Sequence, residues 1–260
     1  MIREAIWMML YSGHILLHKQ VMWRKDLAAW RRYWTSYRAY RRLAPSDNLP
    51  RLRNLTPCLG DDTAETTIEP IYFYQDSWAF GKIVQQKPHR HVDVGSQHKF
   101  VALLSKVLPV TMVDIRPLSL PLDSLNFQEG SILDMPFDDD ALMSVSSMCV
   151  VEHIGLGRYG DPLDAQGTEK AVAELKRIVA PGGDLYLSVP IDSQNRIYFN
   201  AHRAFSEPYF ESLLYPFEIR ERRYIHGTRF SADRGSGYCI GCYHVRKPAQ
   251  STRPSEGLRS

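Results

Sequence analysis

Two aspartates stand in two apolar segments near the middle of the chain. Asp93 lies in His91-Val92-Asp93-Val94-Gly95-Ser96, and Asp114 stands 21 residues later in Val110-Thr111-Met112-Val113-Asp114-Ile115. The β-branched residues predict two buried strands, and Gly95 allows a tight turn after the first. In a doubly wound sheet this spacing places the second carboxylate against ribose hydroxyls, which predicts a site for a nucleotide-like ligand. The alternative is that Asp114 caps the turn that follows it.

A second group of polar residues follows a longer apolar segment, 142–151, which ends in Glu152-His153. At the carboxyl end of a central strand such side chains point into the ligand crevice of an open α/β sheet. An imidazole there can remove a proton from a bound hydroxyl, so His153 is the first candidate for a catalytic base and His202 the second. For each histidine the alternative is a hydrogen-bonded structural role.

A loop punctuated by glycines, residues 155–164, comes directly after His153. Charged side chains in this loop either bind sugar hydroxyls or phosphate, or hold the loop in shape. The candidates for substrate contacts in and around the loop are Glu152, Arg158, Tyr159, Asp161, Asp164, Asn200 and Arg203. We expect no metal site, because His89 and His91 have no third ligand beside them.

Strands and helices alternate around these residues. The predicted strands are 91–94, 110–115, 125–129, 142–151, 185–189, 217–224 and 238–245, with helices over 78–84, 100–108 and 207–214 and another that starts from an N-cap at Thr168. This pattern predicts an α/β fold with a doubly wound, mostly parallel seven-stranded sheet. The last two strands have no long helix between them, so they can form a hairpin that leaves one strand antiparallel.

The chain divides by composition. Residues 1–44 form a basic, aromatic helical arm, 45–70 a linker, 71–246 the α/β domain and 247–260 a polar tail that we expect to be disordered. The overall charge of +3 hides an asymmetry, since residues 1–53 carry eleven Lys or Arg against three Asp or Glu. The basic character therefore belongs to the arm.

Aromatic residues in the arm recur every three or four positions, which predicts an amphipathic helix. The stripe consists of Trp23, Leu27, Trp30, Trp34 and Tyr37. Arginines beside it suit an anionic membrane surface, so peripheral membrane contact through 1–43 is one interpretation. The other is that the stripe packs on the domain with its arginines in solvent, and nucleic acid is the least favoured partner. The sequence makes no prediction about the oligomeric state.

Four cysteines, Cys58, Cys149, Cys239 and Cys242, are too few and too scattered for a disulfide framework. This favours a reducing compartment, and we expect a cytoplasmic protein that contacts the inner face of the membrane if the arm binds lipid. Cys239 and Cys242 have redox or zinc spacing, but no second pair accompanies them and we interpret them as structural.

Over roughly residues 71–246 the chain resembles class I S-adenosylmethionine-dependent methyltransferases. The resemblance rests on Asp93-Val94-Gly95, Asp114, Pro136-Phe137, Glu152-His153-Ile154 and Glu174-Leu175 with Pro181-Gly182-Gly183. Two longer strings are similar to a little-characterised methyltransferase-like family, some of whose members occur among polysaccharide-assembly proteins. These strings are Glu152-His153-Ile154-Gly155-Leu156-Gly157-Arg158-Tyr159-Gly160-Asp161-Pro162-Leu163-Asp164 and Phe199-Asn200-Ala201-His202-Arg203.

The resemblance implies S-adenosylmethionine as cofactor, with Asp114 toward its ribose. The residues implied to face its methionine portion are Asp93, Gly95 and Ser96. The position that commonly carries an acid near the adenine amine falls on Ser131, and the resemblance implies that Ser131 and Ile132 contact the cofactor. Gln97 stands where a second glycine is usual.

The implied reaction is methylation of a hydroxyl on a small molecule, a saccharide or a lipid-linked glycan. Methyl transfer is an in-line displacement that depends on holding donor and acceptor in register and needs no protein nucleophile. Two alternatives stay open. An NAD-dependent dehydrogenase shares the opening strand and acid but favours a fuller glycine pattern, and a membrane-associated adaptor would keep the fold without catalysis.

Overall fold

The computed structural model describes residues 27–249, and the chain divides into two compact units, Met1–Thr67 and Ile68–Ser260. In the first unit residues 27–43 are helical. The described part of the predicted arm is therefore a helix, whereas Trp23 and the rest of the arm before residue 27 lie outside the described residues. No helix within the described part of the chain is both long and apolar enough to cross a bilayer.

The segment predicted as a linker contains two short 3-10 helices, η1 (Ser46–Asn48) and η2 (Leu52–Asn54), with irregular backbone around them. Neither contains a buried residue. The described backbone of this segment is therefore held mainly by local turns.

The second unit is built on one sheet. Its strands are β1 (His91–Val94), β2 (Val110–Asp114), β3 (Leu125–Glu129), β4 (Leu142–Met148), β5 (Val179–Asp192), β6 (Arg196–Tyr198), β7 (His202–Ser206), β8 (Glu218–His226), β9 (Arg229–Ser231) and β10 (Cys239–Arg246). They run in the order β3-β2-β1-β4-β5-β10-β8-β9, and β7 pairs with the end of β5 and with β6. The strands β1 to β5 pair in parallel, whereas β10 is antiparallel to both of its neighbours, β5 and β8.

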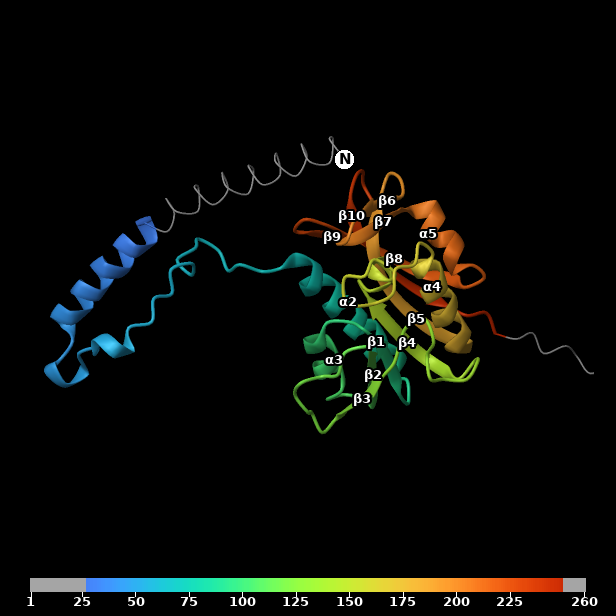
Figure 1. Cartoon of the computed structure of the whole chain (residues 1–260), viewed down its shortest axis with the longest axis horizontal. Coiled ribbons are helices and arrows are strands. Elements are labelled where there is room, and N and C mark those ends of the chain that lie inside the picture. Colours follow the sequence, from blue (N-terminus) through green and yellow to red (C-terminus); the bar gives the residue numbers. More distant parts are fainter. Residues whose placement is uncertain (1–26, 250–260) are drawn as a thin grey trace, which may run out of the picture. The chain divides into compact units, whose positions relative to one another are not determined.

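Helices cover both faces of this sheet (Figure 1). One face carries α2 (Pro70–Gln86) and α3 (His98–Leu104), and the other carries α4 (Gly167–Ile178) and α5 (Glu207–Leu214). Side chains alternate along β5, so that Leu185 and Leu187 pack with α4 and α5 while Tyr186 packs with α2. A strand buried on both faces needs apolar residues at successive positions, which explains the continuous apolar segment in the sequence.

The predicted doubly wound, mostly parallel sheet is confirmed. The seven strands β3-β2-β1-β4-β5-β10-β8 form it, and β10 is the antiparallel strand that the closing hairpin requires. The sequence did not predict β6, β7 or β9. Each has only three to five residues, and β6 is exposed along its whole length, so it carries no pattern of buried positions.

Several element boundaries differ from the prediction: β4 ends at Met148 and not at 151, α3 ends at Leu104 and not at 108, and β5 covers Val179–Asp192 and not only 185–189. Three further differences can be explained by particular side-chain contacts. Thr168 is not the N-cap of α4, because Gln166 holds that position and the buried Thr168 hydroxyl donates to the carbonyl of Val151 at 2.7 Å. The helix predicted from Trp78 begins earlier, at Pro70, since the preceding Glu69 carboxylate accepts from a first-turn N–H.

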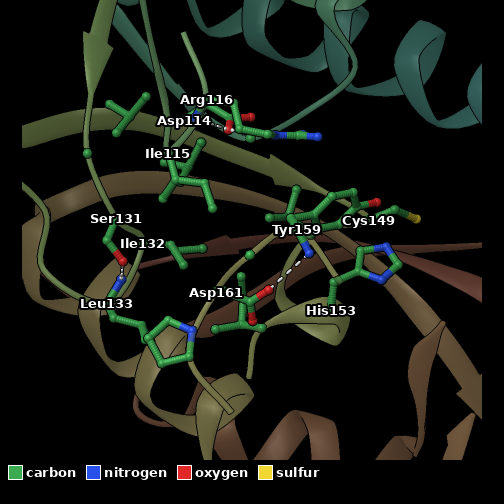
Figure 2. Close-up of a pocket in the computed structure, with 18 residues that line it drawn as sticks. Asp114, Ile115, Arg116, Ser131, Ile132, Leu133, Cys149, His153, Tyr159 and Asp161 are labelled. Atoms are coloured by element: carbon green, nitrogen blue, oxygen red, sulfur yellow. Dashed lines mark hydrogen bonds and ion pairs between the residues drawn. The ribbon is translucent and has the colours of Figure 1, made fainter. Parts of the chain in front are cut away.

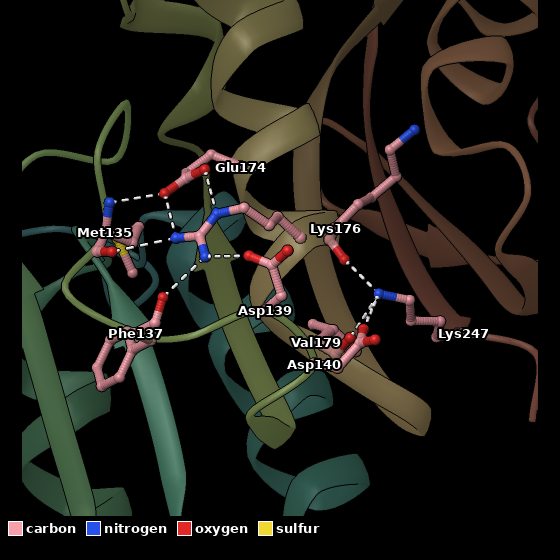
Figure 3. Close-up of polar contacts among 9 residues, drawn as sticks. Met135, Phe137, Asp139, Asp140, Glu174, Lys176, Val179 and Lys247 are labelled. Atoms are coloured by element: carbon pink, nitrogen blue, oxygen red, sulfur yellow. Dashed lines mark hydrogen bonds and ion pairs between the residues drawn. The ribbon is translucent and has the colours of Figure 1, made fainter.

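The third difference lies at the end of the domain. Lys247, which the sequence places in the tail, belongs to the fold (Figure 3). Its ammonium donates to Asp140 and to the carbonyl oxygens of Lys176 and Val179, at 2.5, 2.9 and 2.8 Å.

Arg177 on α4 ties the segment after β3 to the helix, through hydrogen bonds to four residues that Figure 3 labels. Its guanidinium donates to the carbonyl oxygens of Met135 and Phe137 at 3.1 and 2.8 Å. It also donates to the carboxylates of Glu174 and Asp139, both at 2.7 Å, and Glu174 in turn accepts from the backbone N–H of Met135. These contacts fix a segment with little secondary structure of its own.

Replacing Arg177 with Met should therefore destabilise the domain. Hydrogen bonds to a charged group contribute about 1.5–3 kcal/mol each and overlap here, so we expect the free energy of unfolding to fall by about 2–4 kcal/mol in urea titrations. Arg229→Met is the matched control, because its ion pair with Asp233 is exposed and should contribute less than about 1 kcal/mol. Equal losses in the two variants would contradict this role for Arg177.

Candidate active site

The carboxyl ends of β1, β2, β3 and β4 surround a cavity of about 540 Å³. It lies where the strand order reverses, between β1 and β4, which is the usual ligand position in open α/β sheets. Figure 2 shows Ser131 and Leu133 toward one end and Cys149 and His153 toward the other. The sequence-predicted site residues that line this cavity are Gly95, Asp114, Ser131, Ile132, His153, Tyr159 and Asp161.

The turn after β1 forms one wall of the cavity. Gly95 has a φ of +69°, and a Cβ atom there would lie 3.0 Å from Cγ1 of Val150. Asp93 and Ser96 do not line the cavity. The Asp93 carboxylate accepts from the backbone N–H of Ser96 at 3.1 Å, and the Ser96 hydroxyl accepts from the N–H of Met148 at 2.9 Å. Both residues therefore hold the turn against β4.

Asp114 ends β2 at the middle of the cavity wall. Its Oδ1 accepts from the backbone N–H of Arg116 at 2.9 Å, so the turn-capping role that the sequence left open is present. No residue within 27–249 donates to its Oδ2. Asp114 can therefore cap the turn and still accept a hydrogen bond from a ligand hydroxyl in the cavity.

The end of the cavity near β3 is mostly apolar. Ile115, Ile132 and Leu133 line it, and Ser131 stands among them. The Ser131 hydroxyl accepts from the N–H of Leu133 at 3.1 Å, which leaves its own proton free to be donated. This combination suits a flat, largely apolar group with a few polar edges, such as a nucleobase.

The loop 155–164 forms the opposite wall, and Asp161 holds it in shape. The carboxylate accepts from the backbone N–H groups of Gly155, Gly157 and Tyr159 at 2.7, 3.4 and 3.2 Å. Of the two roles that the sequence allowed for Asp161, the structure shows the one that shapes the loop.

Arg203 fixes the base of the same loop. It is buried, and its guanidinium donates to the carbonyl oxygens of Ile154 and Asp164 at 2.5 and 3.0 Å. The Asp164 side chain is paired with Lys170 at 2.7 Å. Neither Arg203 nor Asp164 lines the cavity, and their contacts are with the protein itself.

Tyr159 is the only Phe, Tyr or Trp in the cavity lining of the described chain. The guanidinium carbons of Arg116 and Arg158 lie 4.5 and 5.1 Å from the centre of the ring. A cation over an aromatic ring is attracted by its quadrupole, so Tyr159 links the wall after β2 to the loop.

His153 is held as a neutral imidazole. Its Nδ1 lies 2.6 Å from the carbonyl oxygen of Ala201, which requires the proton on Nδ1 and leaves Nε2 as an acceptor. Burial, with Arg158 nearby, lowers the pKa of His153 to about 4. The ring therefore lines the cavity in the form that can accept a proton at neutral pH.

Glu152, the neighbour of this histidine, is buried and does not line the cavity. Its Oε1 lies 3.8 Å from Nε2 of His153, and within 27–249 its Oε2 has no hydrogen-bond partner. Burial raises the pKa of Glu152 to about 8, so the carboxyl group is mainly protonated at pH 7.

The remaining candidates lie outside the cavity lining. His202 lies against Tyr198 and close to Tyr238, with centroid distances of 4.9 and 6.1 Å, and burial lowers its pKa. Asn200 is exposed, and Arg158 lies beside the cavity, donating to the carbonyl of Ala201 at 2.9 Å.

Sequence reasoning missed several lining residues, among them Ile115, Arg116, Leu133 and Cys149. Each stands within two residues of a strand end or directly after a predicted site residue. The signal that could have found them is therefore their position after a strand.

Two further sequence interpretations concern possible metal or redox sites. His91 lies between the hydroxyls of Ser144 and Ser146, both 2.8 Å from its ring nitrogens. Cys239 and Cys242 are free thiols three residues apart on β10, and they pack into the cores on opposite faces of the sheet. Their positions match the structural role expected from the sequence.

Comparison with known proteins identifies the fold. A family model described as "Caenorhabditis protein of unknown function, DUF268" matches residues 135–228, and no curated protein matches the chain. The [4+2]-cyclase SpnF is similar over 67% of this chain and 80% of its own, with 14% identity and a TM-score of 0.51. The N-methyltransferase NodS from Bradyrhizobium japonicum WM9 is similar over 72% of this chain and 99% of its own, with 14% identity and a TM-score of 0.51.

The chain has the class I methyltransferase fold. At this level of identity the likeness concerns the fold alone, and one of the two neighbours is a cyclase. The class I methyltransferase fold therefore fixes where a ligand binds, while the reaction has to be inferred from the side chains around the cavity.

The buried Glu152 predicts a measurable pH dependence of stability. Its pKa in the folded chain is about 8, above the ordinary value of 4.5, so its contribution is full below about pH 4.5 and is lost as the pH rises through 8. The Glu152→Gln variant lacks this pH-dependent contribution to the free energy of unfolding. Between pH 5 and 9 the wild type should lose on the order of 3 kcal/mol more than the variant in urea titrations.

The exposed Glu65→Gln serves as the control and should follow the wild-type profile. If Glu152→Gln also follows the wild-type profile, the carboxyl group is not held protonated by burial.

Proposed function

We propose that this chain is an S-adenosylmethionine-dependent methyltransferase that acts on a hydroxyl group of a saccharide or lipid-linked glycan. The observation that carries the proposal is one cavity that brings together an apolar end, the Asp114 carboxylate and the neutral imidazole of His153. A nucleoside-like donor and an alcohol acceptor need these three features in this combination.

The residues around the cavity fit S-adenosylmethionine. The cavity volume of about 540 Å³ is within the range of roughly 300–1,000 Å³ for small-molecule sites. Gly95 brings bare backbone to the cavity, and a Cβ atom there would crowd Val150 at 3.0 Å. Asp114 has a free acceptor for ribose hydroxyls, and Ile132 with Ser131 would hold the adenine. The cofactor supplies an electrophilic methyl group on a sulfonium.

His153 would act as the general base for the acceptor. Its Nε2 would accept the hydroxyl proton while the acceptor oxygen bonds to the methyl carbon and the bond from that carbon to sulfur breaks, with the electron pair leaving on the neutral thioether. The Nδ1 proton stays on the ring and continues to donate to the carbonyl oxygen of Ala201. Oε1 of the Glu152 carboxyl group lies 3.8 Å from Nε2, so its partial negative charge would stabilise the positive ring. Glu152 is therefore a residue that supports His153 and does not itself exchange a proton in this mechanism.

The surface next to His153 supports a sugar-like acceptor. Tyr198 and Tyr238 expose 42% and 45% of their surface and flank His202, while Arg158 provides a charged donor. Tyrosine rings combine an apolar face with a polar edge, which matches the alternating character of a pyranose.

The two alternatives make different predictions. A dinucleotide-binding fold of the dehydrogenase type has a parallel strand where β10 is antiparallel, and Gln97 caps α3 with its side chain, accepting from the N–H groups of Lys99 and Phe100. Both observations favour the methyltransferase. A non-catalytic adaptor would bind the cofactor without turnover, so it is separated by an activity measurement.

Calorimetric titration with S-adenosylhomocysteine tests the cofactor assignment. We expect binding heat with this compound and none with NAD. Asp114→Asn should weaken binding about 10–100-fold, because one charge-assisted hydrogen bond is lost. Asp138→Asn, at an exposed aspartate, should bind like the wild type. If the protein binds NAD and not S-adenosylhomocysteine, the methyltransferase proposal is wrong and the dehydrogenase alternative takes its place.

His153→Gln tests the base. With labelled S-adenosylmethionine and glycan extracts as acceptors, we expect kcat to fall about 10²–10⁴-fold while the affinity for S-adenosylhomocysteine changes less than about twofold. Because the pKa of His153 is about 4, the wild-type rate should fall only below about pH 5. The exposed His89→Gln is the matched control. Unchanged turnover in His153→Gln would remove His153 from the mechanism.

A further inference from the structure

The helix over 27–43 presents a row of aromatic rings that the proposed enzymatic function does not use. Trp30, Trp34 and Tyr37 follow one another at intervals of four and three residues, and Tyr33 lies beside them. Neighbouring rings are in contact, with centroid distances of 5.8 Å for Trp30 and Tyr33, 6.3 Å for Trp30 and Trp34, and 5.7 Å for Trp34 and Tyr37. We call Trp30, Tyr33, Trp34 and Tyr37 the aromatic row.

The row is open at its surface. Trp30 and Trp34 expose 38% and 40% of their area, and Leu27 and Leu43 near the helix ends expose 66% and 84%. Another face of the helix is occupied within the same unit, where Arg32 pairs with Asp62 at 2.7 Å and Ala29 is buried. Among the described residues of the first unit, the helix over 27–43 therefore has one covered face and one exposed apolar face.

The charge on this helix has one sign. Residues 27–43 contain five arginines and no acidic residue. These are Arg31, Arg32, Arg38, Arg41 and Arg42. All five are exposed, and Arg41 lies 5.9 Å from the ring centre of Tyr37. Cations that flank exposed indole and phenol rings match a surface with apolar depth and negative headgroups.

We propose that the helix over 27–43 binds the surface of an anionic lipid bilayer, with the aromatic row in the interface and the arginines at the headgroups. The helix lies in the plane of the surface, because 17 residues rise only about 26 Å and the arginines are too frequent for insertion across the bilayer. Indole rings favour the interfacial region, and each arginine adds attraction to anionic headgroups.

Single-stranded nucleic acid is the other polyanion with affinity for arginine and aromatic residues. It binds through bases that stack on free ring faces. In the aromatic row the rings pack against one another, with Trp30 and Trp34 stacked at an interplanar angle of 21°, so part of each face is already used. The exposed leucines have no role with nucleic acid either, which favours the lipid surface.

Vesicle co-sedimentation of the full chain tests the proposal. We expect binding to vesicles of phosphatidylcholine with phosphatidylglycerol, weaker binding to phosphatidylcholine alone, and a decrease as salt is raised. Trp30→Ala with Trp34→Ala should weaken binding about tenfold or more, while alanine maintains the helix. The aromatic control is Phe73→Ala, which removes an exposed ring from α2 in the other unit.

A second pair of variants separates position from net charge. Arg38→Gln with Arg42→Gln should weaken binding to the anionic vesicles about tenfold, whereas Arg51→Gln with Arg53→Gln, which removes the same charge outside the helix, should have a smaller effect. Equal effects of the two pairs, no binding to either vesicle, or binding to single-stranded RNA in preference to vesicles would each overturn the proposal. None of these results bears on cofactor binding, so this proposal and the enzymatic one can fail separately.

Discussion

The fold and the cavity both depend on one buried carboxylate. Asp93 is inaccessible to solvent, and its two oxygens accept from the N–H of Ser96 and the hydroxyl of Ser146 at 3.1 and 2.5 Å. Burial raises the pKa of Asp93 to about 6, and these hydrogen bonds act against that shift. A buried carboxyl group without donors is costly, so the donors must stay in place. The turn that carries Gly95 is thereby fixed to β4, and the wall of the cavity with it.

Contacts between β1 and β4 also explain why β4 contains serines. At the start of β1, His91 is buried between Ser144 and Ser146, and desolvation lowers its pKa to about 3. The ring is therefore neutral and needs one donor and one acceptor, which two hydroxyls supply. From the sequence alone, these serines could be interpreted only as small residues that a strand tolerates. In the structure they form hydrogen bonds with His91 and Asp93 of β1. The two strands on either side of the point where the strand order reverses are therefore joined by buried polar contacts.

Much of the fold could be predicted because it is encoded locally. The bounds of β3 and α5 agree with the sequence prediction, since alternating or helical apolar spacing and proline or glycine punctuation define them. The roles of charged residues could not be predicted, because they depend on which backbone groups come close in space. Asp161 and Arg203 have the chemistry of substrate ligands, yet they bind backbone atoms of the loop 155–164 and its base. The position of Asp114 in the cavity lining, by contrast, could be predicted from its place at a strand end and its spacing from Asp93.

Under the proposed function, the arrangement around His153 would link the charge of an acceptor to the rate of its methylation. The two ends of the loop beside it are closely packed, since a Cβ at Gly155 would lie 2.1 Å from the carbonyl oxygen of Asp164. Arg158 contributes to the low pKa of His153, which keeps the ring neutral but makes it a weak base. An anionic group bound at Arg158 would offset this charge and raise the pKa of the imidazole, so proton removal would become more favourable. A neutral sugar would not offset the charge of Arg158, so His153 would stay a weak base. Arg158 would therefore favour acidic acceptors twice, by binding them and by making His153 a stronger base in their presence.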